Sequence, residues 1–296
     1  MKQFSGIKYR PVCLFLFLTL SIGAGTVQAQ IPRRLVDPGG PVDELFLSQN
    51  IVVTSSVSNL PAGNLNFTIM HVFGRVDEGV QSLWGVDGPA NIRFGLDYGI
   101  SDRLSIGVGR SQFDKLYDFR FKANLLRQSK DGKMPIELAL KGDMGIMTES
   151  NGFEFSDRLN YLGAVMLARR MSDKISLQVS PMISHFNTVS TEHNGETDMH
   201  VEEKTHFAVA LGGRILVNDR VALLVEYIPV FGDRTTATEN AFAVALNIET
   251  GGHVFVIYLK TSDYLTEQHV IARNSEEFFR GDFRLGFIIN RVFSLN

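Results

Sequence analysis

Residues 91–111 read NIRFGLDYGISDRLSIGVGRS, and the spacing of their apolar residues decides the fold. Every second residue from Ile92 to Ile100 is apolar, and the residues between them are Asn91, Arg93, Gly95, Asp97 and Gly99. The alternation stops at Ser101-Asp102 and resumes at Leu104. Because successive side chains of a strand point to opposite faces, the pattern predicts two strands joined by a tight turn, each with one apolar and one polar face.

The same period of two recurs along most of the chain. Clean alternation covers 64–73, 117–125, 136–146, 175–184, 206–215, 241–249 and 282–290, and segments rich in strand-forming residues lie near 159–170, 220–230 and 253–261. Together with the two strands above, these segments give about twelve strands, an even number as in closed bacterial barrels. We therefore expect an all-β protein that forms a single closed antiparallel transmembrane β-barrel.

The connections between the expected strands alternate in length. Short ones lie at 101–102, 129–133, 172–173, 218–219 and 250–252 and contain residues that favour tight turns. Longer ones lie at 75–89, 148–157, 188–204, 232–239 and 262–276, and the link at 112–115 breaks the pattern. Short periplasmic turns and longer extracellular loops are typical of outer-membrane barrels.

The period of two leaves open which face meets water. In a soluble secreted sandwich or barrel the apolar face points inward, whereas in a membrane barrel it meets lipid and the polar face lines the lumen. Strands of about ten residues are long enough to cross a bilayer when tilted. Aromatic residues near strand ends fit the two membrane interfaces: Phe73, Tyr98, Tyr117, Tyr227, Phe231, Tyr258 and Phe293. These features favour the membrane barrel.

The first 62 residues do not follow the strand pattern. Residues 1–29 have a basic start, the apolar run VCLFLFLTL and small residues before Gln30, which predicts a cleaved signal peptide. Residues 30–62 are expected to form a periplasmic leader with a short helical turn at 42–47, which could fold into the lumen as a plug, and 63–296 the barrel. The only cysteine, Cys13, lies in the signal peptide, so the mature chain has no thiolate for a metal or a covalent haem.

Several short stretches resemble one family of proteins. These are Ile69-Met70-His71 followed by Phe73-Gly74, the whole of 91–111, Lys115-Leu116-Tyr117-Asp118 and LLRQS at 125–129. They are similar to an uncharacterised family of outer-membrane β-barrels in Gram-negative bacteria, and the likeness spans most of the mature chain. Val72 stands where that family tends to have arginine. The resemblance implies the fold and an outer-membrane location, and it implies no activity.

Charged residues gather on the face expected to line the lumen. They are Arg93, Asp97, Asp118, Arg120, Lys122, Glu137, Lys141, Asp143, Arg214, Glu226, Glu249, Asp282 and Arg284. One interpretation is a pore lining that selects solutes by charge and size. The other is a set of ion pairs that fills a narrow interior, because buried charges must be paired. Arg93, Asp97, Asp118, Arg120 and Lys122 are the first candidates, since neighbouring strands present them in one belt.

Other candidate sites are weaker. Residues 192–206, EHNGETDMHVEEKTH, hold three histidines among acidic residues but show no recognised metal-ligand spacing, so a solvated loop is the simpler interpretation. A hydrolase site at the rim would need a nucleophile and a histidine within reach of each other. Ser184 and His185 are sequence neighbours and are expected on opposite faces, and no GxSxG motif occurs. We expect no enzyme activity, no metal and no cofactor.

The function expected from the sequence is a narrow, porin-like channel or transporter for small solutes. The alternative is a structural or partner-docking barrel with a sealed lumen, for example for a periplasmic redox or surface protein, and a membrane hydrolase is a weaker one. Expected partners are outer-membrane lipid, the barrel-assembly machinery and a periplasmic protein. The formal net charge of −3 gives no basis for binding nucleic acid.

Overall fold

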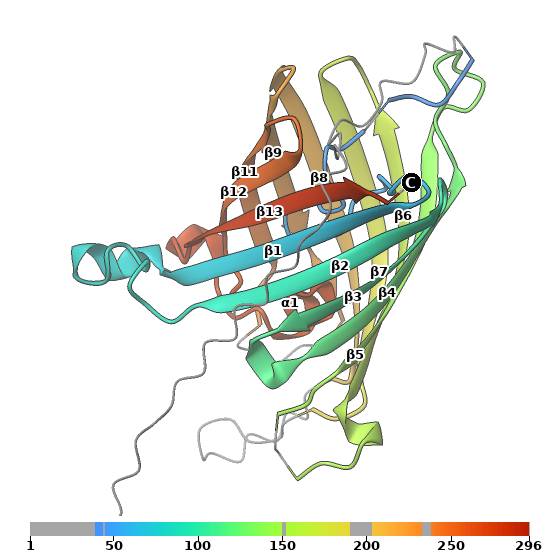
Figure 1. Cartoon of the computed structure of the whole chain (residues 1–296). Coiled ribbons are helices and arrows are strands. Elements are labelled where there is room, and N and C mark those ends of the chain that lie inside the picture. The colour runs from blue at the N-terminus through green and yellow to red at the C-terminus, as the bar shows by residue number, and fades with distance from the viewer. Residues whose placement is uncertain (1–38, 44, 150–151, 190–202, 233–237, 296) are drawn as a thin grey trace, which may run out of the picture.

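The computed structural model describes residues 39–43, 45–149, 152–189, 203–232 and 238–295 (Figure 1). The predicted signal peptide at 1–29, the start of the leader at 30–38 and most of the acidic, histidine-containing loop at 192–206 lie outside the described residues.

The described residues form one closed, all-antiparallel barrel (Figure 1). The strands are β1 (Asn64–Arg75), β2 (Asn91–Ser101), β3 (Leu104–Ser111), β4 (Tyr117–Leu126), β5 (Glu137–Ile146), β6 (Leu159–Arg170), β7 (Ile175–Phe186), β8 (Thr205–Asn218), β9 (Val221–Ile228), β10 (Val230–Phe231), β11 (Ala241–Glu249), β12 (His253–Lys260) and β13 (Arg284–Ser294). β10 follows β9 after Pro229, and both pair with β8, so together they occupy one position in the wall. β1 pairs with β13 and closes the barrel, which therefore has twelve strand positions, as predicted.

The two faces of the wall are assigned as in a membrane barrel. Phe94, Leu96 and Ile106 are nearly half exposed on the outside, whereas Arg93 and Asp118 on the opposite face are buried. Tyr258 is a correction to the predicted aromatic belt. Its ring is buried inside the barrel and its hydroxyl donates to the His71 carbonyl oxygen, because even-numbered residues of β12 point inward.

The ends of the barrel differ as predicted. Short turns join β2 to β3, β6 to β7, β8 to β9 and β11 to β12 at the end where β1 begins and β13 ends. The β4–β5 connection at that end is longer than the predicted 129–133 and runs from residue 127 to 136. The opposite end carries the longer loops with short 3-10 helices, η1 (Val76–Ser82), η2 (Phe113–Lys115), η3 (Ser156–Arg158) and η4 (Phe278–Arg280).

Two segments fill the lumen. Residues 45–60, here the plug hairpin, turn back on themselves through the Asn50–Ser55 bridge, and their partners lie on β4, β7, β8 and β9, which places the hairpin inside the ring of strands. The predicted helical turn at 42–47 is wrong: its described residues form bends without helical bonding, because wall side chains bind the main chain instead. The second segment is α1 (Glu267–Arg273), here the loop helix, within the β12–β13 loop. No helix of the described residues is long and apolar enough to span a membrane.

The interior has an apolar side and a charged side. On the apolar side, Leu45, Phe46, Ile51 and Val52 of the plug hairpin pack among small and medium-sized wall residues. The wall residues are Leu162, Ala164 and Met166 on β6, Ala208 and Ala210 on β8, Leu224 on β9, and Ala243 and Ala245 on β11. The charged side is formed by β2, β4 and β5, and it is here that the candidate site lies.

Candidate functional site

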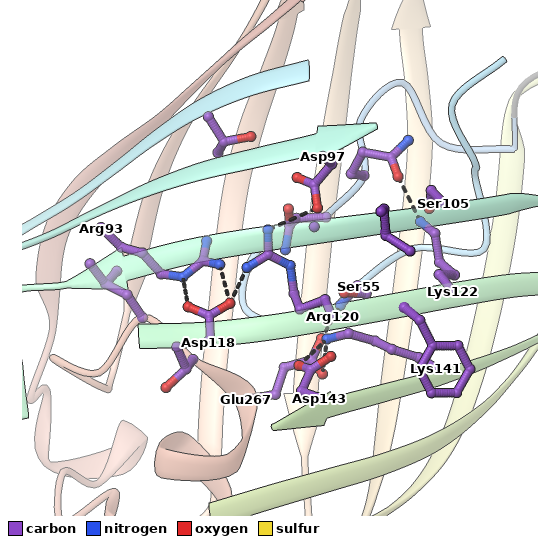
Figure 2. Close-up of a pocket in the computed structure, with 18 of the residues that line it drawn as sticks. Ser55, Arg93, Asp97, Ser105, Asp118, Arg120, Lys122, Lys141, Asp143 and Glu267 are labelled. Atoms are coloured by element: carbon purple, nitrogen blue, oxygen red, sulfur yellow. Dashed lines mark hydrogen bonds and ion pairs between the residues drawn. The ribbon is translucent and has the colours of Figure 1, made fainter. Parts of the chain in front are cut away.

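Four charged residues on β2 and β4 form a continuous ionic network on the charged side of the lumen (Figure 2). Arg93 donates from Nε and Nη2 to the two carboxylate oxygens of Asp118, at 2.9 and 2.6 Å. Arg120 donates to Asp97 at 2.8 Å and also contacts Asp118. The network therefore joins two basic and two acidic residues of the predicted belt, and their charges balance.

Glycines of β3 make this pairing possible. β3 lies between β2 and β4, and its inward positions 107 and 109 are glycine. A Cβ atom on Gly107 would lie 2.0 Å from an Asp97 carboxylate oxygen, and one on Gly109 would lie 2.2 Å from Arg93 Nη2. Both distances are far shorter than a van der Waals contact. The glycines thus let side chains from strands two positions apart meet across the middle strand.

A second charged group lies beside the network and includes a residue of the loop helix. Lys141 of β5 donates to Asp143 at 2.8 Å and to Glu267 at 2.6 Å, and all three side chains are buried (Figure 2). Glu267 also accepts a hydrogen bond from the main-chain N–H of Ser55 in the plug hairpin. Glu267 therefore contacts the wall and the plug hairpin at once.

Wall side chains of β4 hold the plug hairpin by its main chain. Lys122 Nζ donates to the carbonyl oxygens of Ser56 and Ser58, at 3.1 and 2.5 Å, and to Gln49 Oε1 at 2.8 Å. Asn124 Nδ2 donates to the Val57 carbonyl oxygen at 2.9 Å and to Glu137 at 2.8 Å. Lys122 thus donates to three neutral oxygens, whereas the arginines of the ionic network donate to carboxylates.

The tip of the plug hairpin is bound by a carboxylate on β9. Glu226 accepts hydrogen bonds from the main-chain N–H groups of Val53, at 2.6 Å, and Thr54, at 3.1 Å, and from the Thr54 hydroxyl. Arg214 of β8 donates to the Leu45 carbonyl oxygen at 2.8 Å near the hairpin's start. The buried charges of both residues are therefore compensated in part by main-chain dipoles of an uncharged segment.

The loop helix is fixed to the wall by polar contacts at the extracellular end. Gln268 donates to Asn160 of β6 at 3.1 Å, and Arg273 to Asp114 of η2 at 3.1 Å. His269 Nε2 lies 3.3 Å from Asp114. Burial lowers the pKa of His269 below its usual 6.5 despite this carboxylate. Burial raises the pKa of Asp114, but the contact with His269 and the charge of Arg273 outweigh it, so the pKa lies below its usual 3.8.

The last two candidates lie apart from the others. Asp282 precedes β13 and pairs with Arg75. Arg284 begins β13 and pairs with Glu276 of the β12–β13 loop. Both pairs belong to the extracellular mouth, whereas Arg93, Asp97, Asp118, Arg120, Lys122, Lys141 and Asp143 line one cavity in the lumen. Arg214 and Glu226 bind the main chain of the plug hairpin, and Glu137 accepts a hydrogen bond from Asn124.

The cavity between the charged wall, the plug hairpin and the loop helix measures about 50 Å³. It is bounded by Gln49, Asn50 and Ser55 of the plug hairpin and by Thr266 and Glu267 on the loop-helix side. A space of this size and polarity has room for a few water molecules. The charged wall thus borders a small polar space.

Sequence reasoning did not find Glu267, Gln178 or the loop helix. Gln178 of β7 accepts from the Val57 N–H and donates to the Ser55 carbonyl oxygen. Thr266-Glu267 ahead of Val270-Ile271 is a helix-start signal that could have revealed the helix. Among the described residues, no group of three or more histidine, cysteine, aspartate or glutamate side chains could hold a metal ion. Ser184 is fully buried and His185 half-buried on the other face of β7, as expected.

Comparisons with known proteins bear on the family and the fold. Three solved structures are similar: the KdgM porin (8% identity, TM-score 0.45, 79% of this chain and 99% of that chain), LpxR from Salmonella typhimurium (11%, 0.36, 78% and 99%) and Salmonella typhi OmpF in complex with daunomycin (7%, 0.38, 78% and 97%). These likenesses assign no activity. No curated protein matches the chain. A family model described as a membrane bound beta barrel domain (DUF5777) matches residues 46–293.

Proposed function

The chain belongs to this family of membrane-bound β-barrel domains, and from that premise we propose that it is an outer-membrane channel for small polar solutes, closed here by the plug hairpin and the loop helix. The observation that carries the proposal is the polar cavity between the charged wall and these two segments. A barrel that serves only as a scaffold has no need for a charged wall that lines a polar cavity.

The path that we propose follows the charged wall. The plug hairpin packs its apolar residues against β6, β8, β9 and β11, so its polar residues face β2, β4 and β5 across the cavity. Balanced charges in the ionic network present both signs to a passing solute, which suits small polar or zwitterionic molecules more than a single class of ion. Twelve strands enclose a lumen intermediate between filled eight-stranded barrels and open porins of 16–18 strands.

Opening requires the plug hairpin to shift, and Glu226 is the contact to weaken first. This carboxylate holds three donors at the hairpin tip. Glu226→Gln keeps the size of the side chain but removes the charge and one acceptor oxygen. Hydrogen bonds to charged groups contribute about 1.5–3 kcal/mol each, so loss of the charge should raise the open population markedly.

Planar-bilayer recording of the purified protein tests the proposal. We expect rare openings of small conductance for the natural chain and at least a tenfold higher open probability for Glu226→Gln. The matched control is Glu249→Gln, which removes the same charge near the periplasmic end of β11. The absence of current from the natural chain and from Glu226→Gln, with both correctly folded, would refute a channel.

The second candidate is a sealed barrel that docks a periplasmic protein, and one observation favours it. The plug hairpin packs six apolar side chains into a buried cluster, as a permanent part of a core would. In that case Glu226→Gln would lower the unfolding temperature without producing current. The same two variants therefore distinguish the two functions.

A further inference from the structure

The plug hairpin is uncharged although the lumen around it is rich in charge. Residues 45–62 read LFLSQNIVVTSSVSNLPA and contain no aspartate, glutamate, lysine, arginine or histidine. The wall and the loop helix nevertheless direct four charged side chains at them, Lys122, Arg214, Glu226 and Glu267. These charges must therefore be met by something other than ion pairs with the plug hairpin.

Main-chain groups of the plug hairpin bind all four of these charged side chains, and Glu267 is also paired with Lys141. Six side chains of the wall and loop helix bind nine of its main-chain groups. Three side chains donate to carbonyl oxygens: Arg214 to that of Leu45, Lys122 to those of Ser56 and Ser58, and Asn124 to that of Val57. Two carboxylates accept from main-chain N–H groups: Glu226 from Val53 and Thr54, and Glu267 from Ser55. Gln178 does both, since it accepts from the Val57 N–H and donates to the Ser55 carbonyl oxygen. Side chains of the plug hairpin make two such contacts, through Gln49 and Thr54. Recognition is thus mainly of groups that every peptide carries.

The side chains of the plug hairpin are recognised mainly by size and apolarity. They pack against alanines of β8 and β11, which have no functional group to distinguish one apolar side chain from another. Ile51 fits closely against β8, because its Cδ1 lies 2.3 Å from where a Cβ on Gly212 would be. Valine, leucine and isoleucine residues are interchangeable at moderate cost in such surroundings.

We propose that the lumen is a binding site for uncharged peptides, and that the plug hairpin occupies it as an internal stand-in for such a ligand. This names the solute class of the proposed channel and therefore rests on that function. A peptide of serine, threonine, asparagine and small apolar residues would replace each hydrogen bond of the plug hairpin by an equivalent one. A peptide with lysine and glutamate in scrambled order would bury some of its charges beside apolar residues or beside wall charges of the same sign, which is strongly unfavourable.

Displacement is feasible because no described residue of 45–60 forms an ion pair with the wall. Asp43, just before the hairpin, pairs with Lys130 at the periplasmic rim and is largely exposed, and such surface pairs contribute little to stability. The plug hairpin can thus be exchanged for a peptide at little net loss of hydrogen bonding. We expect high salt alone to leave it in place.

Cysteine labelling of the full mature chain tests the proposal. Ser56→Cys places a thiol at a position with no exposed surface, on an otherwise cysteine-free mature chain. A membrane-impermeant maleimide should label it slowly. Three synthetic peptides are added to the protein in liposomes: residues 45–60, a scramble of the same composition, and the scramble with four serine or asparagine residues changed to lysine and glutamate. Asp173→Cys in the exposed β6–β7 turn controls for reagent reactivity.

We expect the first two peptides to raise the labelling rate of Ser56→Cys at least tenfold with saturation, and the charged peptide to leave it unchanged. Acceleration by the 45–60 peptide alone would show that the lumen recognises the side chains of its own plug hairpin, and it would overturn the proposal. No acceleration by any peptide, or equal acceleration by the charged peptide, would also overturn it. Labelling does not depend on conductance, so a barrel without current that still exchanges peptides would refute the channel and leave the peptide site standing.

Discussion

Arg93 of β2 and Asp118 of β4 form a two-point ion pair across β3, directly over Gly109. The two strands are not neighbours, so the pair can form only because the inward positions 107 and 109 of β3, which lies between them, are glycine. Gly107 and Gly109 thus create room for the ionic network.

Gly109→Ala should therefore destabilise the barrel. The new Cβ would lie 2.2 Å from Arg93 Nη2 and 2.5 Å from Asp118 Oδ2, so the buried pair must separate or shift. Overpacking of this kind costs about 1–3 kcal/mol. The loss of stability is measured as a lower midpoint of urea unfolding in detergent. Unfolding is monitored by the mobility of the unheated protein on SDS gels.

The matched control is Gly213→Ala on β8, where the added Cβ would meet only Leu177 at 3.6 Å, an ordinary contact. Its midpoint should stay close to that of the natural chain. Equal midpoints for both alanine variants would show that the pair does not depend on the bare strip of β3.

The sequence predicted the wall better than the interior, and the reason is physical. Alternation reports only which face a residue lies on, so strands and the polar lining could be read from residues such as Phe94 and Asp97. Which charges meet depends on the register between strands and on the space left by Gly107 and Gly109. Pairing over two strands, as between Arg93 and Asp118, leaves no periodic trace in the sequence.

The contents of the lumen were harder still to predict. The plug hairpin has no regular period because wall side chains, not a neighbouring strand, bind its main chain. The loop helix spans seven residues, too short for helical periodicity to stand out. Its contact with the plug hairpin, Glu267 to Ser55, joins residues more than two hundred positions apart.

Neutralising Arg120 and Lys122 together, both to glutamine, should shift ion preference towards cations. Arg120 neutralises Asp97 and Asp118, so its loss leaves acidic charge on the wall, and Lys122 loses its own positive charge. Reversal potentials in a salt gradient, recorded in the Glu226→Gln background, measure the shift. Arg103→Gln with Lys133→Gln in the periplasmic turns is the control for general loss of positive charge. An unchanged reversal potential would mean that the ionic network does not border the path.

Docking of the loop helix should weaken in mild acid because of His269. Its pKa is lowered when the helix is docked, so the docked form binds the proton less readily than the free form. Docking is therefore at full strength above about pH 6.5 and is lost as the pH falls from 6.5 to the lowered value. The pKa of Asp114 is also lowered, so its contribution to docking is present above its usual value of 3.8. That contribution is lost only at a much lower pH than the contribution of His269.

Labelling of Ala272→Cys, a buried position on the loop helix, measures this effect when normalised to Asp173→Cys. The normalised rate should rise between pH 7 and 5. Combining Ala272→Cys with His269→Gln should remove the pH dependence. A pH profile that persists without the imidazole would assign the effect to another group.

Glu267→Gln should loosen the plug hairpin and the loop helix together. The carboxylate accepts from Ser55 N–H and from Lys141, so it is a contact of the helix with both the hairpin and the wall. Loss of its charge removes a buried partner of Lys141 and weakens the bond to Ser55, at a cost of about 1–3 kcal/mol. Labelling of Ser56→Cys and of Ala272→Cys should therefore rise in parallel. The matched control is Glu276→Gln: Glu276 lies in the same loop but pairs with Arg284 at the extracellular mouth, so this change should leave the labelling of Ser56→Cys unchanged. If Glu267→Gln exposed only the helix, the two segments would close the lumen independently, and a signal at the extracellular loop could not reach the plug hairpin through this contact.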